Sequence, residues 1–267
     1  MKKTDIHLHL TFEQHPKTEH MFVSSAEHML PHLRELSIEK GILMSSGEGN
    51  SAVPFGSNDE CRQIAEAFPG IYFWMCNLDD VPENIFERLE TYKNQGAVGI
   101  GELMINRSID DPMIQEIFAA AERLSLPVLF HMSPEVGYEY GIVDDAGLPL
   151  LEESLKKYPN LKFIGHSQPF WHEISGDASG DLSSRMEWGK GEVAPGGRLS
   201  YLFDTYPNLY GDLSANSGGC AIMRDETFGL SFLEKYCDRL MFATDMVNVD
   251  MEFLSENGWR KCTSVVN

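Results

Sequence analysis

The sequence predicts an α/β fold, and more specifically one (β/α)8 barrel of the TIM type that spans residues 1–267 as a single domain. Three observations predict it. Eight short apolar runs recur along the chain, helix-like segments separate them, and 267 residues suit one barrel of ordinary size. Strands that alternate with helices form parallel sheets, and eight such strands can close into a barrel.

The predicted strands are short and mostly apolar, as strands covered on both faces should be. Val128-Leu129-Phe130 and Met241-Phe242-Ala243 are typical of them. In chain order the eight predicted strands are Thr4–Leu10, Gly41–Ser45, Ile71–Asn77, Ala97–Glu102, Pro127–Met132, Lys162–His166, Leu209–Ser214 and Leu240–Asp245.

Capping residues and apolar periodicity predict helices between these strands. Asn58 can cap a helix in which Cys61 and Ile64 begin an apolar stripe. Prolines near the first turn, and Gly or Pro-Asn after the last turn, delimit other helices. The further predicted helices are Glu83–Asn94, Met113–Leu124, Pro149–Tyr158, Leu199–Tyr206 and one that Asp225 caps and that ends before Tyr236.

An open, doubly wound sheet is the alternative fold. Gly47-x-Gly49 follows the second predicted strand and loosely fits a dinucleotide-binding loop, but Pro54 falls where the next helix would run. Only 22 residues follow Asp245, so the last helix of a barrel is expected to be short or absent.

The composition is that of a globular enzyme with an acidic surface. Hydrophobic residues make up 42% of the chain, charged residues 23%, and the formal net charge is −20. This charge opposes binding to nucleic acid, and no Lys/Arg cluster in the sequence offsets it. The five scattered cysteines include no CxxC pair and are expected to be reduced.

The sequence predicts neither a membrane span nor a signal peptide. No apolar run is long enough to span a membrane, and Asp5 stands where a signal peptide would be apolar. We therefore expect a cytoplasmic protein that binds a small molecule rather than a membrane. The sequence leaves the oligomeric state open, a homo-oligomer included.

The most informative pattern is Asp5-Ile6-His7-Leu8-His9-Leu10, in the first predicted strand. Because alternate side chains of a strand point to opposite faces, Asp5, His7 and His9 share one face and the three apolar residues share the other. Two imidazoles about 7 Å apart at the backbone can converge on one divalent ion. Taken alone, the pattern also fits a surface strand with two solvated histidines.

Metal-competent residues end several other predicted strands. The carboxyl ends of barrel strands meet at one mouth, and charged groups buried there need a partner that a divalent cation can supply. Taken alone, His131 could be a core histidine, and Glu102 could pair with Arg107. Their joint occurrence predicts a metal site. The strand-end residues are His9, Glu102, His131, His166 and Asp245.

These motifs resemble the amidohydrolase superfamily of metal-dependent (β/α)8 hydrolases over most of the chain. Residues 206–214, Tyr-Pro-Asn-Leu-Tyr-Gly-Asp-Leu-Ser, and Phe242-Ala243-Thr244-Asp245 look like the amidohydrolase-2, or amidohydrolase-related, branch. Gly101-Glu102 is more similar to TatD-type members, whose glutamate at this place bridges two metals. The chain departs from the branch at Met246, where a proline is usual, and in its short tail.

The resemblance implies one or two divalent ions, with Zn²⁺ expected and Mn²⁺ or Fe²⁺ as alternatives, since imidazole and carboxylate ligands suit all three. It implies hydrolysis of a C–N or C–O bond in an amide, lactone or ester, with Asp245 as the general base and acid for metal-activated water. It assigns His7, His9 and Asp245 to the first ion, His131 and His166 to the second, and Glu102 to the position between them.

Two other activities stay open at this point. Some relatives decarboxylate aromatic acids with one metal ion, and a Glu102 turned away from the site would favour that lyase reaction. A TatD-like nuclease is the third candidate, and the acidic charge opposes it.

Two long connections, Leu10–Ser24 and His166–Leu199, would project from the mouth of the barrel. In the second, Trp171 could stack on a substrate ring or simply anchor the loop, and Arg185 could hold a carboxylate. The candidate substrate-binding residues are Trp171, His172, Arg185 and Ser214.

Overall fold

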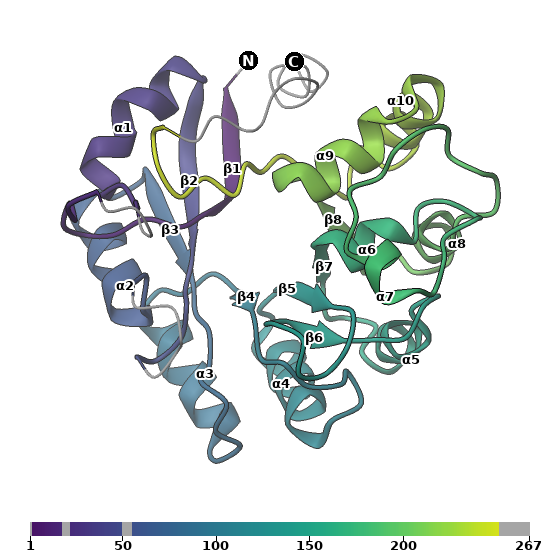
Figure 1. The fold of residues 1–267 in the computed structure, drawn as a ribbon. Helices are drawn as coiled ribbons and strands as arrows, with labels where there is room; N and C mark the ends of the chain where they lie inside the picture. The colour runs from purple at the N-terminus through teal and green to yellow at the C-terminus, as the bar shows by residue number, and fades with distance from the viewer. Residues whose placement is uncertain (1, 18–21, 50–54, 251–267) are drawn as a thin grey trace.

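The computed structural model describes residues 2–17, 22–49 and 55–250, which form a parallel α/β barrel with helices around it (Figure 1). Strands β1 to β3 form one hydrogen-bonded sheet, and β4, β5, β7, β8 and β9 form a second, in chain order. The strands are β1 (Lys3–Leu8), β2 (Ile38–Met44), β3 (Tyr72–Met75), β4 (Ile100–Leu103), β5 (Val128–Ser133), β6 (Ile142–Val143), β7 (Phe163–His166), β8 (Leu209–Asp212) and β9 (Leu240–Met241).

Backbone hydrogen bonds across two seams join the sheets into one barrel. At the seam between β3 and β4, the amide of Cys76 donates to the carbonyl of Gly99 at 2.9 Å. At the seam between the segment after β9 and β1, the amide of Asp245 donates to the carbonyl of His7 at 2.9 Å. The strand order follows the chain without reversing, which excludes the doubly wound alternative. The predicted barrel is confirmed.

Helices cover the outside of the barrel, and four of them, α1, α2, α4 and α10, begin at a side-chain cap. Ser57, one residue before the predicted cap Asn58, accepts the amide of Glu60. The helices are α1 (Ala26–Glu35), α2 (Asn58–Ala67), α3 (Ile85–Asn94), α4 (Pro112–Leu124), α5 (Pro149–Lys157), α6 (Gln168–His172), α7 (Leu182–Arg185), α8 (Arg198–Thr205), α9 (Ala215–Met223) and α10 (Glu226–Lys235).

Apolar side chains form two layers, one inside the barrel and one between the strands and the helices. Glycine makes room for the inner layer: a Cβ on Gly101 would lie 2.9 Å from the Met44 sulfur. The buried members of the inner layer are Met44, Met75, Leu129 and Ile164. This layer fills the barrel beneath the carboxyl ends of the strands, so the centre is a packed core rather than a channel.

The structure departs from the prediction in several elements. Strand β6, which pairs with β5, and helices α1 and α9 are absent from the prediction, and α6 and α7 lie in the connection predicted as loop. Ile6 packs against the inner layer rather than with Leu8 and Leu10, because the register of β1 shifts between Asp5 and Leu8. The predicted short last helix lies outside the described residues.

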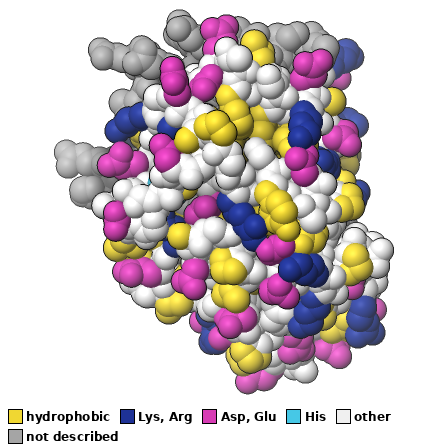
Figure 2. Space-filling model, turned by 90° about the vertical axis from the view of Figure 1, so that its right-hand side faces the viewer, with side chains coloured by type: hydrophobic (Ala, Val, Ile, Leu, Met, Phe, Trp, Pro, Cys, Tyr) yellow, Lys and Arg dark blue, Asp and Glu magenta, His cyan; other side chains and the backbone are white. Residues whose placement is uncertain are grey.

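The surface on the right-hand side of Figure 1 carries interspersed acidic, basic and apolar side chains (Figure 2). No helix among the described residues is long and apolar enough to cross a membrane.

The contact between Gly165 and Phe170 gives a test of the packing. A Cβ on Gly165 in β7 would lie 2.3 Å from carbons of the fully buried Phe170 ring. We expect Gly165→Ala to lower the free energy of unfolding by about 1–3 kcal/mol, because the ring has no free space to enter. Urea unfolding measures it. Gly180→Ala is the control, since its Cβ would meet only Ala146, at 3.5 Å. Equal unfolding midpoints for the two variants would contradict the packing described.

Candidate metal centre

Six imidazole and carboxylate side chains converge at the mouth formed by the carboxyl ends of the strands. They come from β1, β4, β5, β7 and the segments after β1 and β9, which are far apart in the chain but adjacent around the barrel. Most are shielded from water; the side chain of Glu102, for example, is 5% exposed. The six are His7, His9, Glu102, His131, His166 and Asp245, the residues that the sequence predicts as ligands.

The first group surrounds one point in space. The Nε2 atoms of His7 and His9 lie 3.0 Å apart, and each lies 3.4 Å from Asp245 Oδ1. Glu102 Oε2 lies 3.5 Å from His9 Nε2. Two ligands about 2.1 Å from one ion lie roughly 3.0–3.4 Å apart at angles of about 90–110°. These spacings therefore fit a single divalent cation with imidazole and carboxylate ligands.

The second group shares Glu102 with the first. Glu102 Oε1 lies 2.7 Å from His131 Nδ1 and 3.6 Å from His166 Nε2. The two carboxylate oxygens thus face different sets of imidazoles, one on each side. Arg107, the alternative partner for Glu102, instead forms ion pairs with Asp80 and Asp111.

A buried carboxylate behind the centre orients two of the imidazoles. Asp212 Oδ2 lies 2.6 Å from His7 Nδ1 and 3.4 Å from His166 Nδ1, and Asp212 is fully buried. Ser214 Oγ lies 3.0 Å from His166 Nδ1. With their Nδ1 atoms held on this side, both rings present Nε2 to the mouth. Ser214 is thus buried against the histidines rather than open to a substrate.

Sequence reasoning missed Asp212, although the signal was present. Asp212 ends β8, so the rule that found the other strand-end residues applies to it as well. The predicted strand ran on to Ser214, which placed Asp212 inside a strand instead of at its end.

Two further residues hold the backbone of the site in place. Asp5 accepts the hydroxyl of Thr244 at 2.6 Å, and burial raises its pKa to about 7, against the hydrogen bonds from Thr244 and His7. Asn77 donates to the carbonyl of Glu102 at 2.6 Å. Asp5 thus connects β1 to the segment after β9, and it is not among the converging ligands.

The pKa values of His7 and Glu102 are each shifted towards the charged form of the side chain. Burial opposes charge on each group, but contact with partners of opposite sign outweighs it. The pKa of His7 is raised well above its usual value by Asp245 and Asp212, and that of Glu102 is lowered well below by His131. The buried carboxylates therefore favour positive charge among them. A divalent cation supplies that charge while the imidazoles stay neutral.

Two of the predicted substrate-binding residues of the long loop are buried and bonded to backbone carbonyls. Trp171 is buried and donates its indole N–H to the carbonyl of Asp212 at 2.9 Å. Arg185 is also buried and donates to the carbonyls of Pro134 and Asp144. Both residues therefore anchor loops, which argues against direct contact with a substrate. Glu173, which follows α6 in the same connection, is buried as well.

His172 lines a surface cavity of about 230 Å³. Trp188 and Arg224 also line this cavity, but none of the six converging residues does. Its Nε2 lies 2.9 Å from the carbonyl of Ser179. The predicted role of His172 in substrate binding thus has no geometric support at the metal centre.

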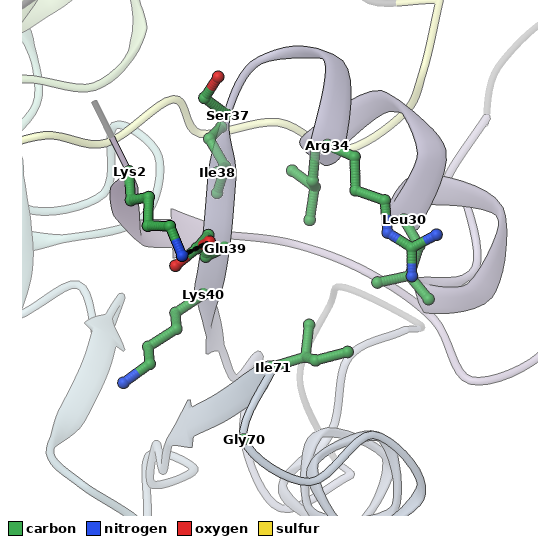
Figure 3. A pocket seen from close by; sticks show the side chains of 10 residues that line it. Lys2, Leu30, Arg34, Ser37, Ile38, Glu39, Lys40, Gly70 and Ile71 are labelled. Atoms are coloured by element: carbon green, nitrogen blue, oxygen red, sulfur yellow. Dashed lines mark ion pairs between the residues drawn. The ribbon is translucent and has the colours of Figure 1, made fainter.

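A larger cavity, of about 610 Å³, lies at the opposite end of the barrel (Figure 3). Lys2, Ile38 and Ile71 line it, and they stand at or just before the amino ends of β1, β2 and β3. Active sites of such barrels lie at the carboxyl ends of the strands. This cavity is therefore not part of the candidate centre.

Tyr140 is a mouth residue that the sequence did not indicate. Its ring lies 4.4 Å from the ring of His131, centroid to centroid, and it is 47% exposed. Burial raises the pKa of its phenol, and the carboxylates of Glu102 and Asp245 raise it further. Tyr140 thus borders the metal centre on the open side.

Residues 5–262 match the model of the Amidohydro_2 family, described as Amidohydrolase. The chain belongs to this family. The match covers almost the whole sequence and every residue of the candidate centre. The protein is therefore a metal-dependent enzyme of the amidohydrolase type. No protein of curated function matches the sequence.

Solved structures similar to this amidohydrolase share its fold. A probable 2-pyrone-4,6-dicarboxylic acid hydrolase from Acinetobacter baumannii is 14% identical, with a TM-score of 0.57 over 100% of this chain and 92% of that one. A 2,6-dihydroxybenzoate decarboxylase from Rhizobium is 15% identical, with a TM-score of 0.56 over 98% of both chains. A 5-carboxyvanillate decarboxylase from Novosphingobium aromaticivorans is 14% identical, with a TM-score of 0.57 over 99% and 90%.

The contact between Asp212 and His7 gives a test of the metal centre. We expect Asp212→Asn to weaken divalent metal binding about 10–100-fold, because an amide holds the His7 Nδ1–H less strongly than a carboxylate does. Competition with a chromogenic chelator measures the dissociation constant. The exposed Asp238→Asn is the control for the charge change. An affinity equal to that of the control would show that Asp212 does not orient the ligand.

Proposed function

We propose that this amidohydrolase hydrolyses a C–O or C–N bond of a small molecule, as in a lactone, ester or amide. The position of Glu102 carries the proposal, because its carboxylate lies between two sets of imidazoles. A carboxylate in that position suits two ions, and a pair of ions clamps both the attacking and the leaving atom in a displacement. We propose Zn²⁺, with Mn²⁺ or Fe²⁺ as alternatives.

When bound, a divalent cation lowers the pKa of a coordinated water from 15.7 towards ~7 and polarises a substrate carbonyl. Asp245 is the protein group placed to move protons in such a reaction. Its side chain is 26% exposed, against 5% for Glu102, so it faces the open side where water and substrate arrive. In this proposal the Asp245 carboxylate accepts the proton of the attacking water and passes it to the leaving group.

A second candidate is non-oxidative decarboxylation of an aromatic acid at one metal ion. The observation in its favour is that Nε2 of His7, His9 and His166 all face the Asp245 carboxylate, at 3.4, 3.4 and 4.0 Å. Four such ligands suffice for one ion. Similar structures with bound manganese include decarboxylases of substituted benzoic acids. The acidic surface continues to oppose the nuclease alternative.

Metal stoichiometry and substrate choice separate these two reactions. For a hydrolase we expect two equivalents of metal by mass spectrometry of metals, and turnover of members of a panel of lactones, esters and N-acyl amino acids. One equivalent of metal together with release of CO2 from aromatic acids would replace the hydrolase proposal with the decarboxylase.

The role of Asp245 has its own test. We expect Asp245→Asn to lower kcat about 10²–10⁴-fold on the best substrate of the panel, because the amide cannot accept the proton from water. Metal content is measured beside kcat, since Asp245 is also a candidate ligand. Asp250→Asn is the matched control, at an exposed carboxylate outside the centre. Undiminished turnover in Asp245→Asn would exclude it as the general base.

A further inference from the structure

The loop between β5 and β6 is fixed tightly against the metal centre. Gly141 adopts φ +109°, and a Cβ there would lie 2.7 Å from the carbonyl oxygen of His131. Its amide donates to the carbonyl of Met104 at 2.8 Å. Asn106 donates to the carbonyl of Gly141 at 3.0 Å and accepts the amide of Gly137. The end of this loop therefore has a defined position next to β5, where only glycine fits.

This anchoring places Tyr140, the residue before Gly141, on the ring of His131. The ring centroids lie 4.4 Å apart with the planes tilted by 54°. One side of the phenol thus rests on a candidate ligand, while the residue stays 47% exposed. Tyr140 packs on the ring of a candidate ligand. Tyr138, in the same loop, makes no such ring contact within the described residues.

The hydroxyl of Tyr140 makes no hydrogen bond to the described part of the protein, although it lies within electrostatic reach of Glu102 and Asp245. An ordinary phenol is protonated at neutral pH and donates one hydrogen bond. The neighbouring acidic groups accept hydrogen bonds but are engaged with imidazoles. A hydrogen-bond donor that has no protein partner and lies at the edge of a metal centre is available to a bound small molecule.

We propose that the Tyr140 hydroxyl donates a hydrogen bond to a carbonyl or carboxylate oxygen of the substrate at the metal centre, and that Tyr140 helps determine substrate specificity. This inference rests on the proposed function for the reaction, but it concerns ligand binding and can be tested without turnover. Substrates with an oxygen beside the reacting carbon would be favoured over those without one, since a hydrogen bond fixes orientation as well as affinity.

Acetohydroxamic acid is a suitable probe, because its two oxygens bind a divalent ion and also accept hydrogen bonds. We expect Tyr140→Phe to load metal as the wild-type protein does but to bind this probe about tenfold more weakly, in calorimetry of the zinc-loaded protein. Tyr138→Phe removes a hydroxyl from the same loop and is the matched control. We expect its affinity to equal that of the wild type.

Two results would overturn the inference. The first is equal probe affinity for Tyr140→Phe and the wild type. The second is weaker binding that merely follows a loss of metal or a lower melting temperature of Tyr140→Phe, which would make the residue a structural support for His131. Failure of the proposed function looks different: the panel of esters, lactones and amides is not turned over, while the tenfold effect on the probe remains.

Discussion

The amide of Asp245 donates to the carbonyl of His7. The catalytic proposal depends on this hydrogen bond, which joins the last part of the barrel in the chain to the first strand. It lies at the seam where the segment after β9 meets β1. A barrel that stayed open there would leave His7 and His9 on one sheet edge and Asp245 on another. Closure puts their ligand atoms 3.4 Å apart, which is the spacing of groups that share one ion.

Closure also concentrates negative charge, and this charge explains how the centre is built. Glu102 and Asp212 are almost fully buried, and each is offset by imidazoles rather than by lysine or arginine. Imidazole can give up its proton to solvent when a cation arrives, whereas arginine cannot. The imidazoles that lower the free-energy cost of burying these carboxylates therefore also leave the site ready to bind a metal ion.

Much of this arrangement follows from local patterns in the chain. The apolar runs around Val128 and Phe163, each followed by a histidine, predict buried parallel strands with a histidine near the carboxyl end, and the structure has both strands, with both histidines in the candidate centre. Two features were missed, for different reasons. Asp212 was placed inside a strand because strand ends are uncertain by a few residues, and Tyr140 has no local signal because its neighbour His131 belongs to another element.

The sequence by itself determined the fold class and the six residues that converge, because strand period and strand-end chemistry are written within a few consecutive positions. Only the tertiary structure decided which side of each ring faces the ion, that Trp171 and Arg185 anchor loops, and that Tyr140 borders the mouth. These are relations between side chains on different strands and loops. Their distances depend on barrel closure and packing, which no local stretch of sequence encodes.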